Sequence, residues 1–307
     1  MSFTRILVFF ILASAATALA EWRVALPGWN YRFPEDHGTH PDFKTEWWYF
    51  TGNLKTDDGE DFGYQLTFFR QGVIEPGREI PKSNFLQRDI KFAHFAVSDI
   101  AAKKFHHFQK LARGAFGEAG FEDGARLAWL DNWSCERTGL HDFRLRASDG
   151  EVSIDLALRS KRNPVVHGRE GVSQKSEGAG RASHYYSLTR LETSGTVRIG
   201  KKTHAVSGLT WFDHEWATNQ LAANQTGWDW FSLQFENGAE LMIFQIRTKD
   251  GTRDTFSSGT WIAADGSTRK IDFADFSLEP IDWWTSPKTK GRYPVGWKIS
   301  IPSLELS

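Results

Sequence analysis

The run TWFDHEW, from Thr210 to Trp216, combines two carboxyl groups with aromatic rings. In an extended chain, successive side chains point to opposite faces. One face of this run then carries Trp211, Asp213 and Glu215, and the other carries Phe212, His214 and Trp216. Carboxyl groups two residues apart on a strand have Cβ atoms about 6.5 to 7 Å apart, so in a dry pocket one can stay protonated while the other ionises. The run predicts an acid beside a base, unless both groups face solvent or pair with Arg190 or Arg70.

A third carboxylate lies among aromatic residues in EWWYFTG, from Glu46 to Gly52. Alternation places Glu46, Trp48 and Phe50 on one face of this run. Burial of a carboxylate costs several kcal/mol unless the group is hydrogen-bonded, paired or protonated. The simplest explanation for Glu46 is a salt bridge to an arginine across a barrel.

Two further aromatic runs complete the set of candidate binding residues. SHYYSLTRL begins at Ser183, and GWDWFSLQF begins at Gly227 and places Trp228, Trp230, Ser232 and Gln234 on one face. Aromatic rings that share a face can line a cavity for an apolar ligand. The candidate substrate-binding residues are Trp211, Trp216, Glu46, Trp48, Tyr185, Trp228 and Trp230.

The elements that must position these residues are predicted to be strands. Apolar residues recur with a period of two, and the runs are separated by pairs typical of tight hairpins: Asp58-Gly59, Asp149-Gly150, Asn237-Gly238, Asp250-Gly251 and Asp265-Gly266. This pattern predicts an all-β chain built as an antiparallel barrel or sandwich, with a meander through 239–248 and 252–263. Residues 99–113 fit a capped helix and a strand equally well. The polar, glycine-rich segment 167–183 is predicted to be a surface loop, with a lid over a ligand cavity as the alternative.

Composition excludes several classes of function. The chain has 307 residues, with 37 basic and 38 acidic side chains and a net charge of -1, so it lacks the positive charge that nucleic-acid binding requires. Its single cysteine, Cys135, excludes an internal disulfide. Residues 1–20 have the basic start, apolar centre and small-residue end of a secretory signal, which predicts a periplasmic or secreted protein with no integral membrane segment after the signal is removed.

Neither a metal nor a cofactor is expected. His37, His40, His94, His184 and His214 follow no metal-ligand spacing, although strand topology could bring some of them together. A serine nucleophile is also disfavoured, because the chain has no G-x-S-x-G turn. The predicted partner is therefore an apolar small molecule.

Several runs in this order resemble the carotenoid 1,2-hydratase, or hydroxyneurosporene synthase, family and its AttH-type predicted secreted hydrolase relatives. The resemblance rests on HPDFKTEWWYFTGNL, YQLTFFR, FAHFAVSD, SHYYSLTRL, GLTWFDHEW and GWDWFSLQF. It implies two tandem lipocalin-like β-barrels, here 21–216 and 217–307, which are expected to meet near 213–226. The last run, YPVGWKISIPSLELS, alternates without a closing turn, so the second barrel is expected to be incomplete and the chain a fragment.

The resemblance implies addition of water to an alkene, with a lipid carrier and a secreted hydrolase as alternatives. For hydration, Asp213 is predicted to donate the proton and Trp211 and nearby indoles to stabilise the carbocation. Glu215 or His214 would then accept the proton of the attacking water.

Overall fold

The computed structural model describes residues 21–81, 83 and 86–306, in which strands dominate and the helices are three short 3-10 turns, η1 (Glu35–His37), η2 (Phe273–Asp275) and η3 (Pro302–Leu304). The all-β prediction is confirmed. The predicted signal at 1–20 lies outside the described residues. Among the described residues, no helix has the length and apolar character needed to cross a membrane.

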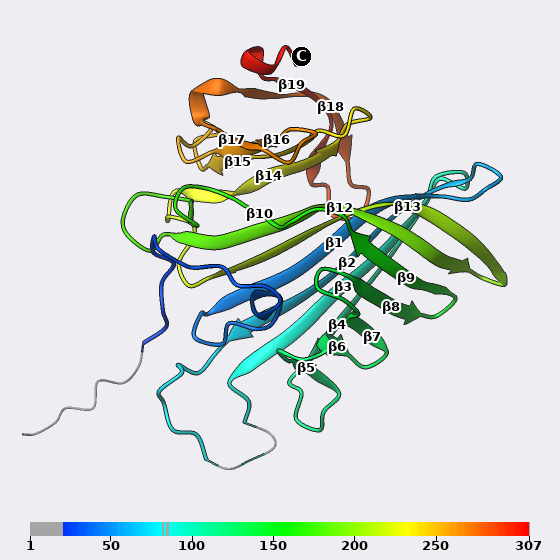
Figure 1. Ribbon diagram of the computed structural model, residues 1–307, viewed down its shortest axis with the longest axis horizontal. Coiled ribbons are helices and arrows are strands. Elements are labelled where there is room, and N and C mark those ends of the chain that lie inside the picture. The colour runs from blue at the N-terminus through cyan, green and yellow to red at the C-terminus, as the bar shows by residue number, and fades with distance from the viewer. Residues whose placement is uncertain (1–20, 82, 84–85, 307) are drawn as a thin grey trace, which may run out of the picture.

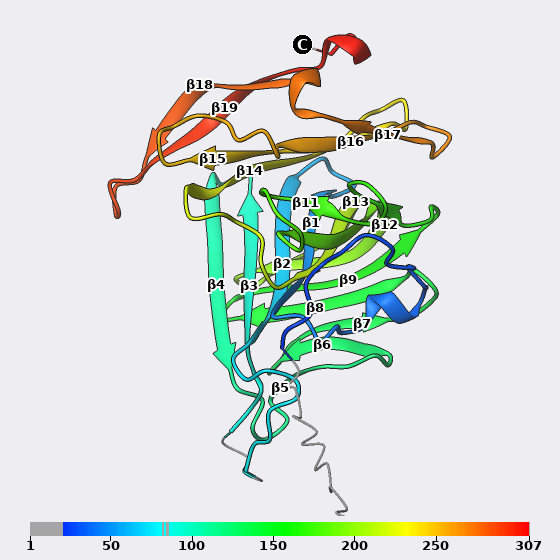
Figure 2. The same cartoon turned by 90° about the vertical axis from the view of Figure 1, so that its left-hand side faces the viewer.

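The first and larger sheet is antiparallel and curls into a nearly closed barrel (Figures 1 and 2). Its strands run in the order β4-β3-β2-β1-β13-β12-β9-β8-β7-β6-β5, and the edge strand β4 comes back into contact with β6. Their bounds are β1 Thr45–Lys55, β2 Asp61–Gly72, β3 Asp89–Asp99, β4 Lys104–Ala112, β5 Ala119–Phe121, β6 Arg126–Leu130, β7 Trp133–Arg137, β8 Phe143–Asp149, β9 Val152–Ser160, β12 Ala182–Ile199 and β13 Lys202–Ala217. Short strands β10 (Val165–Val166) and β11 (Ser173–Gln174) also pair with β12.

A second layer packs against one side of this barrel (Figure 2). It consists of a four-stranded sheet, β14 (Gln225–Gln234), β15 (Glu240–Thr248), β16 (Ser258–Ile262) and β17 (Thr268–Ile271), and a hairpin, β18 (Ser277–Thr285) and β19 (Arg292–Ser300). Strand β15 is buried on both faces: Met242 and Phe244 pack toward the first sheet, and Leu241 and Ile243 pack toward the hairpin. Burial on both sides explains why its sequence is a continuous apolar run.

Turn chemistry accounts for the hairpins. Gly59, Gly150, Gly238, Gly251 and Gly266 all have φ between 54° and 92°, a region that favours glycine. The ambiguous segment 99–113 is a strand: β3 ends at Asp99, the chain turns, and β4 follows. Its apolar residues Phe105 and Leu111 are 69% and 75% exposed, whereas Phe108 on the opposite face packs against the core.

The first sheet extends to Ala217 and the second begins at Gln225. The division into domains at 216 and 217 stays a prediction. The architecture nevertheless gives strands β1 and β13 two different environments, since one face of each strand lines the barrel interior and the other faces the second layer.

Candidate active site

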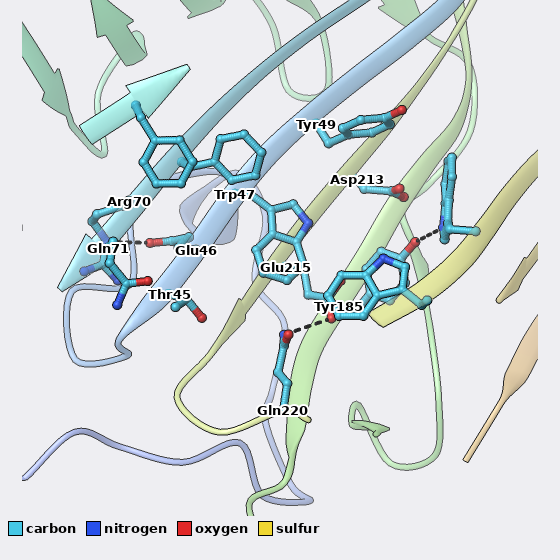
Figure 3. Close-up of a pocket in the computed structure, with 14 residues that line it drawn as sticks. Thr45, Glu46, Trp47, Tyr49, Arg70, Gln71, Tyr185, Asp213, Glu215 and Gln220 are labelled. Carbon is cyan, nitrogen blue, oxygen red and sulfur yellow. Dashed lines mark hydrogen bonds and ion pairs between the residues drawn. The ribbon is translucent and has the colours of Figure 1, made fainter. Parts of the chain in front are cut away.

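A cleft of about 550 Å³ lies between the outer face of the first sheet and strand β14 (Figure 3). In register, Trp47 of β1 pairs with Glu215 of β13, and Tyr49 pairs with Asp213. These four side chains share the outer face, as the alternation of both strands requires. Tyr185 of β12 and the β14 residues Trp228 and Trp230 also line the cleft.

Asp213 is buried in the wall of this cleft and bonds only to uncharged donors. Its Oδ1 accepts the Ser187 hydroxyl and, at 2.7 Å, the Trp211 indole N–H. Burial raises the pKa of Asp213 to about 7, and the charge of Glu215 adds to this rise, whereas hydrogen bonds from Ser187, Trp211 and Tyr185 oppose it. Because the Ser187 and Trp211 donors both meet Oδ1, Oδ2 is the oxygen better placed to carry the proton.

A directional chain of hydrogen bonds holds Asp213. The Ser187 hydroxyl has one proton and gives it to Asp213, so the Nε2–H of His167, at 2.7 Å, donates to Ser187. The Nδ1 of His167 then accepts the Thr260 hydroxyl of β16 at 2.9 Å. Burial, with the nearby charge of Lys175, lowers the pKa of His167 to about 3, which keeps the ring neutral.

Glu215, two residues from Asp213 on the same face, has a cationic partner. The Lys175 ammonium lies 3.4 Å from Glu215 Oε1, and the Gln220 amide donates to the same oxygen at 3.3 Å. Burial lowers the pKa of Lys175, although Glu215 and Asp213 counteract that shift. The ammonium also lies 4.2 Å from the centre of the Phe244 ring. The pair supplies an ionised base beside the acid.

Behind these residues, on the inner face of the same strands, lies a second polar cluster centred on Glu46. Its Oε2 accepts the Arg70 Nε–H at 3.1 Å, and its Oε1 lies 2.7 Å from His40 Nδ1 and 3.0 Å from His214 Nε2. His40 Nε2 lies 3.1 Å from Asp36. All these groups are buried or nearly so.

The charges of this cluster cancel. Burial raises the pKa of Glu46, but the charge of His40, hydrogen bonds from His214 and His40 and the charge of Arg70 outweigh it and hold the pKa well below its usual range. Burial likewise lowers the pKa of His40, and Glu46 and Asp36 more than offset this, so the net shift is upward. Two carboxylates therefore face a guanidinium and a charged imidazole.

His40, Glu46 and His214 also have the spacing of a metal site, with ligand atoms within 4.8 Å of one another. A cation at this point would have to displace the Arg70 guanidinium from Glu46 and approach a charged His40. The donor set fits an ion-pair network better than a metal ion.

Comparison with known proteins agrees with this architecture. The family model described as AttH-like matches residues 24–307. The chain belongs to the AttH-like family. A crystal structure of a candidate AttH protein from Nitrosomonas europaea is 34% identical, with a TM-score of 0.82, and the match covers 90% of this chain and 83% of that one.

A second crystal structure shares the fold of this AttH-like chain. Kievitone hydratase from Nectria haematococca matches with a TM-score of 0.67 at 14% identity, and the match covers 88% of this chain and 76% of that one. At this identity the likeness concerns the fold alone. No curated protein matches the chain. The match to the AttH-like family model confirms the resemblance to the AttH-type group, and the fold is lipocalin-like.

The structure divides the residues singled out from the sequence between the two faces. Asp213, Glu215, Glu46, Tyr185, Trp228 and Trp230 line the cleft, and Trp211 lines the adjoining hollow. The side chains of His214, Trp48 and Trp216 point into the barrel, where the ring centres of Trp48 and His214 are 4.6 Å apart and those of Trp216 and His40 are 3.7 Å apart. Glu46 borders the cleft, but it is 1% exposed and its carboxylate bonds to the groups of the barrel interior. Of the two predicted acceptors for the proton of water, only Glu215 faces the cleft.

The predicted ionic partners also differ from those found. Arg70 binds Glu46 from the neighbouring strand β2, not from across the barrel, and Arg190 binds Glu240. Asp213 therefore pairs with neither arginine.

Sequence reasoning missed Lys175, His167 and Ser187. Lys175 and His167 belong to the segment predicted to be a surface loop, yet both are buried against β12. A lysine and a histidine within a polar, glycine-rich run give no local sign of burial, so only the fold reveals them.

Proposed function

We propose that this protein adds water to the alkene of an apolar, isoprenoid-like or lipid-like small molecule held in the cleft. One observation carries the proposal: Asp213 is buried at the wall of an aromatic cleft, bonds only to uncharged donors and has an ionised carboxylate as its neighbour on the same face. An acid held neutral near pH 7 is the group that protonation of an isolated alkene requires.

The geometry supports a stepwise reaction. Asp213 Oδ2 gives its proton to one alkene carbon, the π electrons form the new C–H bond, and the other carbon becomes a carbocation. Trp211, Trp230 and Tyr49 offer ring faces to that charge, worth about 2 kcal/mol or more in a desolvated site. Water adds to the cation and loses a proton to Glu215. Proton return from Glu215 to Asp213 after product release restores both groups.

Lys175 and Gln220 keep Glu215 in place as the base. The bonds to Oδ1 keep Asp213 in place as the acid, with Oδ2 directed at the substrate. The division of labour between the two carboxyl groups thus follows from their different partners.

The deciding variant is Asp213→Asn, which keeps size and hydrogen bonding but removes the acid. We expect hydration of isoprenoid alkenes, followed by mass spectrometry of the alcohol, to fall by more than 1,000-fold, roughly the upper range of general acid catalysis, while ligand affinity changes only a few-fold. Asp155→Asn, on the exposed outer face of β9, is the matched control.

Undiminished hydration in Asp213→Asn would reject the proposal. Tight binding by the wild type with no turnover of any alkene or ester would favour a carrier, and ester cleavage that survives Asp213→Asn would favour a hydrolase that uses other residues.

We also propose that the protein is exported, on the signal-like pattern of residues 1–20. Mass spectrometry of the N-terminus of protein recovered from the periplasm or medium should show cleavage before Glu21. A retained N-terminus in the cytoplasmic fraction would contradict export.

A further inference from the structure

Both walls of the cleft change from aromatic to polar in the same direction. On β1 the outward side chains are Trp47, Tyr49, Thr51 and Asn53, and on β14 the facing side chains are Trp228, Trp230, Ser232 and Gln234. The ring centres of Trp47 and Trp228 are 6.5 Å apart, and those of Tyr49 and Trp230 are 5.6 Å apart. These two contacts show that the strands run in the same direction, so their polar ends lie at the same end of the cleft.

A second hollow of about 560 Å³ lies at this polar end and shares Tyr49 and Trp230 with the first. Thr51, Asn53, Ser232 and Gln234 line it, and every described residue of its lining is uncharged. The two hollows adjoin at the Tyr49–Trp230 contact, so a ligand that fills both must lie along these two rings.

The polar hollow is suited to a hydrogen-bond donor. Gln234 Nε2 donates to the Thr189 carbonyl at 2.6 Å, which leaves its Oε1 as an acceptor. The Thr51 hydroxyl donates to the Tyr64 carbonyl at 3.1 Å, which leaves oxygen lone pairs. Acceptors without a nearby charge complement a hydroxyl group better than a carboxylate or phosphate.

Solvent exposure alone does not explain the gradient. Trp228, at the aromatic end, is 39% exposed, and Phe69 and Phe92 stack 4.6 Å apart beside it. Large aromatic residues are thus kept at an end that water reaches, which is typical of a surface that binds an apolar group.

We propose that the ligand is an elongated, uncharged amphiphile, with an apolar arm against Trp47 and Trp228 and a hydroxyl-bearing arm at Thr51, Ser232 and Gln234. The seven residues of strand from Trp47 to Asn53 span about 20 Å, which is the length such a ligand would cover. Asp213 pairs with Tyr49 and so lies at the junction of the two arms. This inference rests on the proposed function and adds to it the substrate class and the position of the reacting alkene between the arms.

Three probes that share one carbon skeleton test the inference: farnesene, farnesol and farnesoic acid, titrated into the full chain at pH 8 and followed by tryptophan fluorescence and calorimetry. We expect farnesol to bind at least tenfold more tightly than farnesoic acid, and also more tightly than farnesene. In the double variant Asn53→Leu/Ser232→Val, the preference for farnesol over farnesene should disappear while farnesene still binds. Ser194→Val, on the exposed face of β12, is the control and should keep the wild-type order.

Equal affinities for the three probes, or a preference for farnesol that survives the double variant, would overturn the inference. Tighter binding of farnesoic acid would also overturn it and indicate an anionic ligand. The same titrations on Asp213→Asn separate this inference from the proposed hydration, because a probe order unchanged in that variant, with no hydration by the wild type, leaves the amphiphile site standing and removes only the chemistry.

Discussion

Strands β1 and β13 carry a buried carboxyl group on each of their two faces, and the two groups have opposite acid strengths. Asp213 faces the cleft, where burial raises its pKa to about 7. Glu46 faces the barrel interior, where its pKa is held well below the usual range. Both are almost inaccessible to water, at 4% and 1% exposure. Burial therefore does not decide the protonation state, and the charge of the hydrogen-bond donors does.

This contrast separates a site built for folding from one built for chemistry. Glu46 is held by a guanidinium and imidazoles and has no reason to bind a proton. Asp213 receives a hydroxyl and an indole N–H, which orient it without stabilising its charge fully. A carboxyl group left under-compensated in a cleft is a candidate for catalysis on physical grounds.

The largest loss of stability is expected from a change in the polar cluster centred on Glu46, in the barrel interior. Glu46→Gln leaves Arg70, which is 3% exposed, without its counter-charge, and should lower the free energy of unfolding by about 3 to 5 kcal/mol in urea denaturation at pH 7. Because the folded pKa of Glu46 is depressed, its contribution is present above the unfolded pKa and lost as the pH falls through the folded value. The difference in the free energy of unfolding between the variant and the wild type should therefore become smaller at acid pH. A loss below 1 kcal/mol would show that the inner network does not hold the fold.

Asp213, in the cleft, should make the stability of the protein depend on pH in the opposite sense. The raised pKa of Asp213 means that the folded protein holds a proton that the unfolded chain releases between about pH 4 and 7, so wild-type stability falls across that range. Asp213→Asn cannot ionise and should be more stable than the wild type at pH 8, by about 2 to 4 kcal/mol at most, with the difference shrinking toward pH 4. Thermal unfolding over this range measures it. A variant that is less stable at every pH would mean that Asp213 is ionised in the fold.

Removal of an uncharged hydrogen-bond donor from Asp213 should have a smaller effect, a shift in the pKa of its carboxyl group. Ser187→Ala removes a hydrogen bond that lowers the pKa of Asp213, so that pKa should rise, by about one unit or less for a neutral hydrogen bond. The protonated carboxyl band, assigned by infrared difference against Asp213→Asn and titrated with pH, reports the change. Ser153→Ala, remote on β9, should leave the titration unchanged. An unaltered pKa in Ser187→Ala would remove Ser187 from the set of groups that tune the acid.

The sequence predicts which residues share each face of β1 and β13, but not which distant segments pack against those faces. A period of two assigns Asp213 and Glu215 to one face and His214 to the other, and Asp-Gly and Asn-Gly pairs locate the hairpins, because both are local properties of the chain. The register of β1 against β13, which pairs Tyr49 with Asp213, depends on contacts far apart in sequence. So does the approach of Lys175 and His167 from a polar loop to β12.

The inner cluster shows the same limit. Glu46 invites a charged partner, and the sequence offers several arginines and histidines without ranking them. The segment that follows η1 brings His40 to Glu46, with Asp36 behind His40, and the β1–β2 register brings Arg70. The segment 99–113 is ambiguous for a different reason: burial alternates along β4, but apolar Phe105 and Leu111 lie on its exposed face, so the sequence does not alternate between apolar and polar residues.

The smallest effect is expected where a carboxylate is paired but exposed. Asp155 accepts two bonds of 2.8 Å from Arg144 on the outer face of β8 and β9, which is better geometry than Glu46 has with Arg70. The side chains are 44% and 43% exposed, however, so water and salt screen the pair. Asp155→Asn should therefore change the free energy of unfolding by less than about 1 kcal/mol, and less still at high salt. If urea denaturation gave a loss equal to that of Glu46→Gln, ion-pair geometry rather than burial and charge compensation would govern these sites, and the contrast between Asp213 and Glu46 would lose its physical basis.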